Sequence, residues 1–552
     1  MGSPTLMDND VVIVGGGHNG MTCGAYLARA GASVVVVERR SIVGGCGTSE
    51  HLIDDLPGFT FNPGAVELLG FTSQPVYRDF ALDLHGLELI PNDPFYFMPF
   101  ADGKSIFIHR SPEETAESIR AVSETDARAY LRYVRFWSEL DELIGPFYTQ
   151  AAPLPGRPPG RQRRLPRGRR SFGMAIRRSR ATLGSAARVT RSRAAAEMLR
   201  IAMMPARRYL AEAFESPHVQ ALMAFFAMQT KTSLDDPGSA LGMVELPWSH
   251  AGGVHRPRGG MGSVTQAIAR AFEAEGGTIL REAHVEEILV ERGRAIGVRV
   301  AGGAEIRARR AVVAAVSPLR TFLDLVDAAN LDPGFRRRVE HIQNDNTNVI
   351  KGYYALDEPP VFSPCGDDGS ERRWRTAAGM LCPSVEAADR MWADIRAGGL
   401  PGSIAWVWCT LTSVLDPTMA PPGKHTLGLH IWAPYELAGG RDWEAVKEEM
   451  TLRLFDEYCR YAPNLTGKLI GWAARTPKDW EEITDNPKGN MFHLDYVPHQ
   501  IFGLRPLPEL SDYRSPIDGL YLSGAGMHPG PAITGLPGHN TAQTVLEDTD
   551  FA

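Results

Sequence analysis

The chain has few cysteines and no paired-cysteine motif. Among 552 residues there are six, Cys23, Cys46, Cys365, Cys382, Cys409 and Cys459, and no two form a Cys-x-x-Cys pair. This scatter argues against a disulfide framework and against a zinc site, so we expect a reducing, cytoplasmic setting and no metal. We interpret Cys46 as a small packing residue, because no second cysteine nearby in the sequence would complete a redox pair.

Long hydrophobic runs and charge of one sign are also scarce. The N-terminus shows no basic region followed by an apolar stretch, which argues against a signal peptide, and no apolar run is long enough to span a bilayer. A net charge of -7 gives no reason to expect nucleic acid as a partner. The length and the 43% of hydrophobic residues predict a globular protein with two or more domains.

Glycine, by contrast, forms a dinucleotide-binding pattern near the N-terminus. A short apolar strand at 11–14 leads into Gly15, Gly17 and Gly20, and the helix-like segment that follows them leads to a second apolar strand. Gly15 permits a tight turn, Gly17 lets the backbone approach a pyrophosphate, and Gly20 lets the helix pack closely on the strand. The spacing therefore predicts a βαβ unit that binds a dinucleotide.

The polar residues of the same unit fit this interpretation. The helix starts near His18 and Asn19, so its free N–H groups and positive end face the phosphates. Glu38 ends the second strand about twenty residues further on, where a carboxylate accepts hydrogen bonds from ribose hydroxyls.

Two glycine-rich stretches further along extend the predicted site. Gly44 and Gly45 let the backbone pass close to the middle of a bound cofactor, although a plain turn is the alternative. The second stretch holds Gly260 and Met261 and precedes a helical pattern over 263–275. Strand-like runs follow at 278–280, 284–290, 295–300 and 311–315.

Residues 519–540 supply the third piece. A strand-like run ends at Gly524 and Gly526, a second glycine-rich turn holds Gly535, and the last helix begins near Pro537. The positive end of that helix favours negative charge, such as the charge that a reduced flavin carries on its pyrimidine ring.

The order of these motifs resembles that of FAD-dependent oxidoreductases of the phytoene desaturase (carotenoid desaturase) type. Within that group, the stretches 16–20, 416–425 and 524–530 look like the branch of pyridine nucleotide-disulfide oxidoreductase domain-containing protein 2. Carotenoid desaturases usually carry Arg after the glycine pair, where this chain has Cys46. The resemblance covers nearly the whole chain and implies the cofactor and fold more firmly than the reaction.

The resemblance implies an α/β fold with two interleaved parts. A discontinuous Rossmann-like FAD-binding domain of the glutathione-reductase and amine-oxidase type is expected over 8–71, 251–317 and 501–552. An α+β substrate domain is expected over 72–250 and 318–500.

The resemblance also implies where each part of FAD lies. The adenosine is expected on Glu38 and around Val285, the pyrophosphate on the first glycines, and the flavin ring near Gly45, Gly526 and the turn 535–540. The implied cofactor-binding residues are Gly15, Gly17, His18, Asn19, Gly20, Glu38, Arg39, Gly44, Gly45, Gly260, Met261, Val285, Gly524, Gly526, Gly535, Leu536 and Asn540.

The substrate half is rich in aromatic residues. Strand-like runs at 403–411 and 426–432 predict a sheet that covers the substrate. Dense aromatic and Met side chains accompany it: Phe225, Phe226, Met228, Trp248, Trp406, Trp408, Trp432 and Tyr435. Core packing is one interpretation. The other is a pocket for a lipophilic or conjugated substrate, for which we select Phe225, Trp248, Trp406 and Trp432.

Between 156 and 208 lies an Arg-rich insertion with almost no acidic residues. Its Pro-rich first part predicts a loop, and its later part, 174–209, is compatible with a basic amphipathic helix. An exposed solvated loop, attachment to the inner face of an anionic membrane, and docking of a partner are all open interpretations. Liposome flotation with and without the insertion tests the second one: undiminished binding after deletion would remove it.

We expect flavin chemistry in a dry pocket. His528, which follows Gly526, is the candidate catalytic residue, with a hydrogen bond to the turn backbone as the alternative role. His493 and Asp495 are further candidates for the pocket. The predicted reaction moves a hydride from a lipophilic or conjugated substrate to flavin N5, as in a desaturase or dehydrogenase.

No second complete fingerprint for NAD(P)H is present, so the expected electron acceptor is oxygen or a quinone. Three alternatives stay open because they share the scaffold: a flavin-dependent isomerase or saturase, an amine oxidase, and a non-enzymatic lipid-binding chaperone resembling GDP-dissociation inhibitors.

Overall fold

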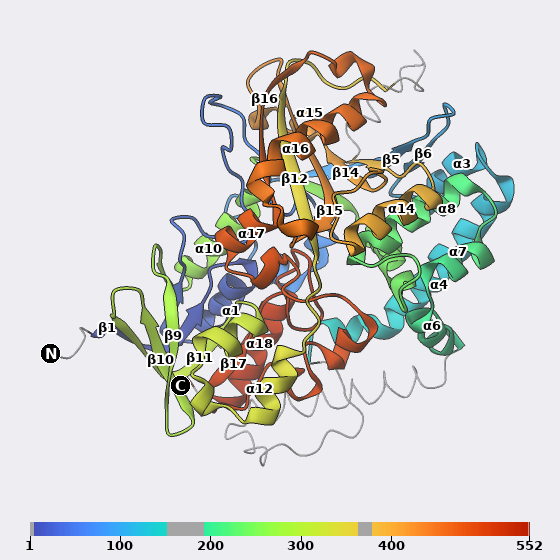
Figure 1. The fold of residues 1–552 in the computed structure, drawn as a ribbon. Helices are drawn as coiled ribbons and strands as arrows, with labels where there is room; N and C mark the ends of the chain where they lie inside the picture. The colour runs from blue at the N-terminus through green and yellow to red at the C-terminus, as the bar shows by residue number, and fades with distance from the viewer. Residues whose placement is uncertain (1–4, 152–192, 363–377, 550, 552) are drawn as a thin grey trace.

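Two seven-stranded sheets organise the protein (Figure 1). The computed structural model describes residues 5–151, 193–362, 378–549 and 551. Of the Arg-rich insertion, only residues 193–208 fall within these ranges.

The first sheet has the order β8-β2-β1-β11-β10-β9, with β17 paired to β11. The pairs β1–β2, β1–β11, β2–β8 and β11–β17 are parallel, and β9 and β10 are antiparallel additions. Its strands are β1 (Thr5–Val14), β2 (Val34–Val37), β8 (Thr278–Leu280), β9 (Val285–Glu291), β10 (Arg294–Val300), β11 (Glu305–Ala314) and β17 (Leu520–Leu522). Both ends of the chain lie beside this sheet (Figure 1).

Both faces of the central strands are buried, which explains their unbroken valine runs. Val11 and Ile13 of β1 pack under three helices, and Val12 and Val14 pack on the opposite face against β9–β11. The three helices are α1 (His18–Arg29), α10 (Gly262–Ala274) and α18 (Leu536–Asp548).

The second sheet has the order β16-β12-β15-β14-β13-β5-β6. Its strands are β5 (Tyr96–Pro99), β6 (Ser105–Ile108), β12 (Thr347–Leu356), β13 (Ala378–Leu381), β14 (Val407–Thr410), β15 (His425–Pro434) and β16 (Leu469–Arg475). Helix α16 (Trp443–Cys459) covers one face, where the Tyr354 hydroxyl donates to the Thr451 carbonyl at 2.7 Å. The opposite face carries Tyr353, whose hydroxyl donates to the Pro63 carbonyl at 2.9 Å.

The remaining helices gather mostly beside the second sheet (Figure 1). They include α3 (Pro112–Arg120), α4 (Glu124–Tyr148), α6 (Arg193–Met203), α7 (Ala206–Ala213), α8 (Pro217–Ala227), α9 (Glu245–Gly252), α14 (Val385–Arg396) and α17 (Pro477–Thr484). Two other helices, α2 (Pro75–Asp79) and α12 (Pro333–Glu340), pack nearer the first sheet. In the described ranges no helix is both long enough and apolar enough to cross a bilayer.

The strands of the two large sheets come from the two sets of segments that the sequence assigns to separate domains. A third sheet crosses that division, because β7 (Val254–Pro257) pairs with β3 (Leu68–Leu69) and with β4 (Leu89–Asn92). The domain boundaries themselves stay a prediction.

Two sequence expectations need correction in detail. The strand expected over 403–411 is shorter, because only Val407–Thr410 forms ladder hydrogen bonds. The single helix considered up to Tyr209 is interrupted, since α6 ends at Met203 and α7 begins after Pro205, which cannot donate a helical hydrogen bond. The part of that expectation before residue 193 lies outside the described residues.

We predict that Gly538→Ala destabilises the protein. Gly538 lies in the first turn of α18, and a Cβ there would lie 2.1 Å from the Asn19 carbonyl oxygen of α1. Forcing the two helices apart is expected to lower the unfolding free energy by about 1–3 kcal/mol, measured by thermal or denaturant unfolding.

The matched control is Gly145→Ala in α4, where a Cβ meets no atom within 4 Å. Alanine there is expected to be neutral or slightly stabilising. Equal stability of the Gly538→Ala and wild-type proteins would contradict the close helix contact.

Candidate functional site

The turn between β1 and α1 has the shape that its glycines predict. Gly15 adopts a φ of +99°, and a Cβ on Gly20 would lie 2.1 Å from the Gly15 carbonyl oxygen. A Cβ built on Gly17 meets no atom within 4 Å, so open space lies above this residue at the N-terminus of α1. The turn therefore presents bare backbone and a positive helix end to that space.

Glu38 is buried at the end of β2, beside the same turn. One carboxylate oxygen accepts the Gly16 N–H at 2.8 Å, and the other accepts the Arg40 N–H at 2.8 Å. A carboxylate has about four lone-pair sites, so two remain for hydroxyl donors.

The Gly44–Gly45 segment links the opening turn to the mid-chain bend. The Gly44 N–H donates to the Gly16 carbonyl at 2.8 Å, and Gly45 adopts a φ of +58°. On its other side, Thr265 of α10 donates to the Gly47 carbonyl at 3.0 Å. A plain local turn does not describe this segment, because it is held between two distant parts of the chain.

The bend at Gly260 and Met261 is held by the side chains of Ser49 and Asn62. Gly260 adopts a φ of +84°, and the Met261 N–H donates to the Asn62 side-chain oxygen at 2.9 Å. Ser49 accepts the next N–H, from Gly262, also at 2.9 Å. These side chains satisfy the first donors of α10, so this helix end is already capped by the protein.

The C-terminal glycines bring the third stretch to α1. A Cβ on Gly524 would lie 2.9 Å from the His493 ring, and one on Gly526 would lie 2.5 Å from Pro318. Gly535, with a φ of +69°, packs beside Thr22 of α1, where a Cβ would lie 2.9 Å from the hydroxyl oxygen. The N-terminal ends of α1 and α18 therefore converge.

The residues at this convergence fit FAD. Buried polar atoms of Asn19, Thr22 and Ser523 have no hydrogen-bond partner among the described residues. Buried polar groups are normally paired, so these atoms indicate a polar ligand. Two helix N-termini, an open backbone above Gly17 and a carboxylate with free acceptor capacity match a dinucleotide with a negative diphosphate.

Other predicted cofactor residues lie around this centre. Val285 begins β9 near the end of β2, where the Ala283 N–H donates to the Glu38 carbonyl at 2.9 Å. The Asn540 side chain donates to the Tyr148 carbonyl at 2.9 Å, and Leu536 is buried at the start of α18. Arg39 pairs with Asp485 at 3.7 Å. The ligand-binding roles of all these residues stay predictions.

His528 is fully buried on the C-terminal turn. Its Nε2 lies 2.9 Å from the Phe147 carbonyl, and its ring stacks on Tyr148 with centroids 6.3 Å apart. Burial lowers the pKa of His528 to about 4, so the ring is neutral at pH 7. A catalytic role for His528 stays a prediction.

The two other polar candidates of the pocket have different surroundings. His493 lies against Gly524 with a pKa lowered to about 3, because burial and the charge of Arg505 disfavour its charged form. Asp495 instead forms a buried ion pair with Lys231 at 2.7 Å. A role of Asp495 in the pocket stays a prediction.

Three of the four predicted pocket aromatics pack together at the second sheet: Trp432 on β15, Trp406 just before β14, and Phe225 on α8. Trp406 stacks on Phe225 at 4.8 Å and on Trp432 at 5.1 Å, measured between ring centroids. Trp248 lies apart, in edge contact with Tyr148 at 5.7 Å. The sequence did not separate these two clusters, because the contacts of Trp248 with Tyr148 and of Trp406 with Phe225 join residues that are far apart in the chain.

Lys351 is a functional candidate that the sequence analysis missed. It lies opposite His430 in the β12–β15 pair, on the aromatic face, and its Nζ donates to the carbonyls of Asn62 at 2.8 Å and Gly64 at 3.1 Å. The Ala65 N–H binds the Cys46 carbonyl at 2.9 Å, so this lysine reaches the segment beside the glycine pair. Its signal is a lysine within the otherwise apolar or uncharged strand 347–356.

Burial lowers the pKa of Lys351. It is 2% exposed, no carboxylate lies within ion-pair distance among the described residues, and its pKa is lowered to about 7. Burial is the main cause, and the charges of Arg475 and Arg256 add to it. The amine therefore exchanges a proton near neutral pH.

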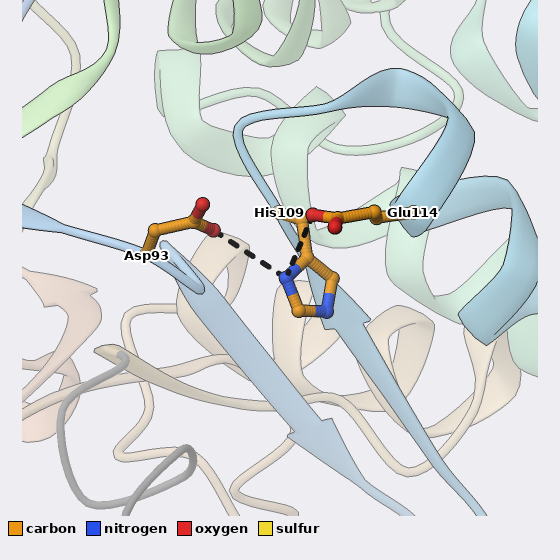
Figure 2. A group of neighbouring side chains, drawn as sticks. All are labelled: Asp93, His109 and Glu114. Carbon is orange, nitrogen blue, oxygen red and sulfur yellow. Dashed lines mark ion pairs between the residues drawn. The ribbon is translucent and has the colours of Figure 1, made fainter.

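Asp93, His109 and Glu114 form a separate side-chain group at the rim of the second sheet (Figure 2). Both carboxylates approach the same ring nitrogen of His109, at 3.4 and 3.8 Å, and both are largely exposed. Nothing further in this group points to a bound ion, and the expectation of no metal stays a prediction.

The fold and this site define a FAD-dependent oxidoreductase. Residues 20–531 match the family described as flavin containing amine oxidoreductase. The chain belongs to this family.

Curated relatives match along almost the whole chain. The rat (Rattus norvegicus) pyridine nucleotide-disulfide oxidoreductase domain-containing protein 2 is 32% identical, over 98% of this chain and 93% of the relative. A limonene dehydrogenase component of Castellaniella defragrans is 28% identical, over 98% and 94%. A phytoene desaturase of Cereibacter sphaeroides is 24% identical, over 97% and 94%. These relatives confirm the resemblance that the motifs indicated.

Solved structures confirm the fold class. A mutant of putrescine oxidase superposes with a TM-score of 0.61 at 16% identity, over 99% of this chain and 100% of the other. At this identity the likeness concerns the fold alone.

We predict that Lys351→Met changes the pH dependence of stability. The pKa of Lys351 is near 10.5 in the unfolded chain and about 7 in the folded protein. Between these two pH values the unfolded chain binds more protons than the folded protein. The free energy of unfolding of the wild type therefore rises with pH in this range. Methionine removes this contribution. The melting temperature of the variant minus that of the wild type is therefore expected to be higher at about pH 6 than at about pH 9.

Lys424→Met is the control, because Lys424 is partly exposed and pairs with Asp357. Its effect is expected to be nearly constant across the same pH range. A Lys351→Met effect that is identical at both pH values would contradict an uncompensated buried lysine.

Proposed function

We propose that the protein is a flavin-dependent dehydrogenase or desaturase that removes hydrogen from a lipophilic or conjugated substrate. The observation that carries this proposal is the aromatic face of the second sheet, which includes Lys351 and is turned toward the segment beside Gly45 and Cys46. Two of the relatives bear the names limonene dehydrogenase and phytoene desaturase, and both names denote removal of hydrogen.

The aromatic face gives the substrate an apolar wall. Trp406 and Trp432 are at most 3% exposed, and their indole N–H groups donate to the carbonyls of Phe225 and Met228 at 2.9 and 3.0 Å. These bonds satisfy the indole N–H groups, and the ring faces stack on Phe225 and on each other, so the cluster is a packed apolar layer. A packed apolar layer of this kind excludes water from a substrate that lies against it.

The charges near this wall favour a substrate without a positive charge. Glu67 pairs with Arg256 at 3.2 Å and accepts the hydroxyl of Tyr96, whose ring contacts Trp408 at 5.4 Å. Burial and the neighbouring Glu67 raise the pKa of Glu245 to about 8, so Glu245 is neutral at pH 7. Neither carboxyl group is available to pair with a substrate ammonium group.

Bound FAD supplies a hydride acceptor at N5 and a route for electrons to oxygen or a quinone. The aromatic wall holds the substrate and keeps the site dry. Lys351, with a pKa near neutrality, is able to take up or release a proton at its Nζ.

Anaerobic mixing of the flavin-loaded protein with separate probes tests the proposal. Limonene and phytoene represent hydrogen-bearing lipophilic substrates, and putrescine and cyclohexylamine represent amines. We expect a lipophilic probe, and neither amine, to bleach the oxidised flavin spectrum.

Each other result points to a different function. Bleaching by an amine alone would replace the proposal with an amine oxidase. Conversion of a lipophilic probe without net flavin reduction would indicate an isomerase. A folded protein that cannot take up FAD would favour the lipid-binding chaperone.

We predict that His528→Ala retains FAD and loses turnover by at least about 100-fold, the lower range for removal of an acid–base group. Turnover is measured with the first probe that reduces the flavin. His341→Ala, an exposed histidine bonded to the Arg337 carbonyl, is the control and is expected to keep full activity. Full activity of His528→Ala would remove His528 from the mechanism.

A further inference from the structure

Arg505 is a fully buried arginine whose donors all meet backbone carbonyls. Its exposure is 0%, and its guanidinium donates to carbonyl oxygens at 2.8–3.5 Å. The five acceptors are the carbonyls of Phe492, Leu494, Asp495, Gln500 and Ala525. An arginine side chain has five N–H donors, and these carbonyls satisfy its hydrogen-bonding capacity without any carboxylate.

The positive charge of Arg505 has no counter-ion within ion-pair distance among the described residues. Asp495, the acid whose charge acts on it, is already paired with Lys231 at 2.7 Å. Burial lowers the pKa of Arg505 to about 10, so the guanidinium stays charged at pH 7. A charge in such surroundings acts strongly on its neighbours, because little solvent screens it.

The field of this charge reaches the candidate flavin site. Arg505 lowers the pKa of His493, which lies against Gly524, and that of His528 on the same turn. In both cases burial is the larger cause and the charge of Arg505 adds to it.

Arg505 also orients one peptide of the glycine-rich turn. Both its Nε and its Nη2 donate to the Ala525 carbonyl, at 3.1 and 2.8 Å. In a trans peptide the C=O and the following N–H point in opposite directions, so the Gly526 N–H points away from Arg505. Gly526 is buried, and in the described structure its N–H meets no acceptor. A buried backbone donor without a partner indicates a ligand at that position.

We propose that Arg505 is a positioning residue for the flavin: it turns the Ala525–Gly526 peptide so that the Gly526 N–H donates to a ring heteroatom of FAD, and its uncompensated charge stabilises the reduced, negatively charged ring. The inference depends on FAD binding and not on the identity of the substrate. It therefore stands or falls separately from the proposed dehydrogenase function.

The test is the midpoint potential of bound FAD in Arg505→Met and Arg505→Lys, together with the FAD dissociation constant of each apoprotein. Methionine removes both the charge and the donors. We expect the preference for reduced over oxidised flavin to fall at least tenfold, a decrease of about 30 mV for a two-electron couple. Lysine keeps the charge but loses the planar fork, so a smaller decrease and weaker FAD binding are expected.

Arg514→Met is the matched control. Arg514 belongs to the same part of the fold but pairs with Asp512 and Asp548, both at an N–O distance of 2.7–2.8 Å. It is expected to leave the potential unchanged.

An unchanged potential in FAD-loaded Arg505→Met would overturn the proposal. If that variant does not fold, Arg505→Lys decides alone: a lower potential supports the proposal, and a wild-type potential contradicts it. A purely structural arginine would lower the melting temperature of Arg505→Lys and leave the potential of the bound flavin unchanged.

Discussion

The close approach of α1 and α18 is the contact on which the site depends. Gly20 lets α1 rest on the Gly15 carbonyl, and Gly538 lets α18 rest on Asn19, so two helix N-termini meet where any side chain would separate them. Their positive ends then act on one space, and the open backbone above Gly17 lies there too. This geometry suits a ligand with a negative diphosphate.

Two buried basic side chains, Lys351 and Arg505, have no carboxylate within ion-pair distance in the part of the chain that the structure describes. Lys351 and Arg505 bind only backbone carbonyls in the described structure, whereas Glu245 is protonated at pH 7 and Glu67 is neutralised by Arg256. Burying charges in this way costs stability unless a ligand compensates for it. A cofactor that gains negative charge on reduction provides that compensation, and an apolar substrate does not compete for it.

Local patterns were the part that the sequence predicted well. The glycine turn, the strand at 11–14, the apolar strand before Glu38 and the strand 278–280 depend on neighbours in the chain. They appear as the second half of β1, as β2 and as β8. The roles considered for Lys351 and Arg505 depend on contacts with residues far away in the chain. One example is the hydrogen bond from Lys351 to the Asn62 carbonyl, across 289 positions, which no spacing rule predicts. For the same reason the sequence grouped Trp248 with Trp406, although their ring contacts differ.

The central claim is that three distant stretches of chain make one FAD site between the N-termini of α1 and α18. A crystal structure of the FAD-loaded protein tests it most directly. The account predicts diphosphate density at Gly17, ribose hydroxyls on Glu38 and the flavin ring beside Gly526 and the start of α18. Density for FAD anywhere else, or a ring separated from the C-terminal turn, would contradict it.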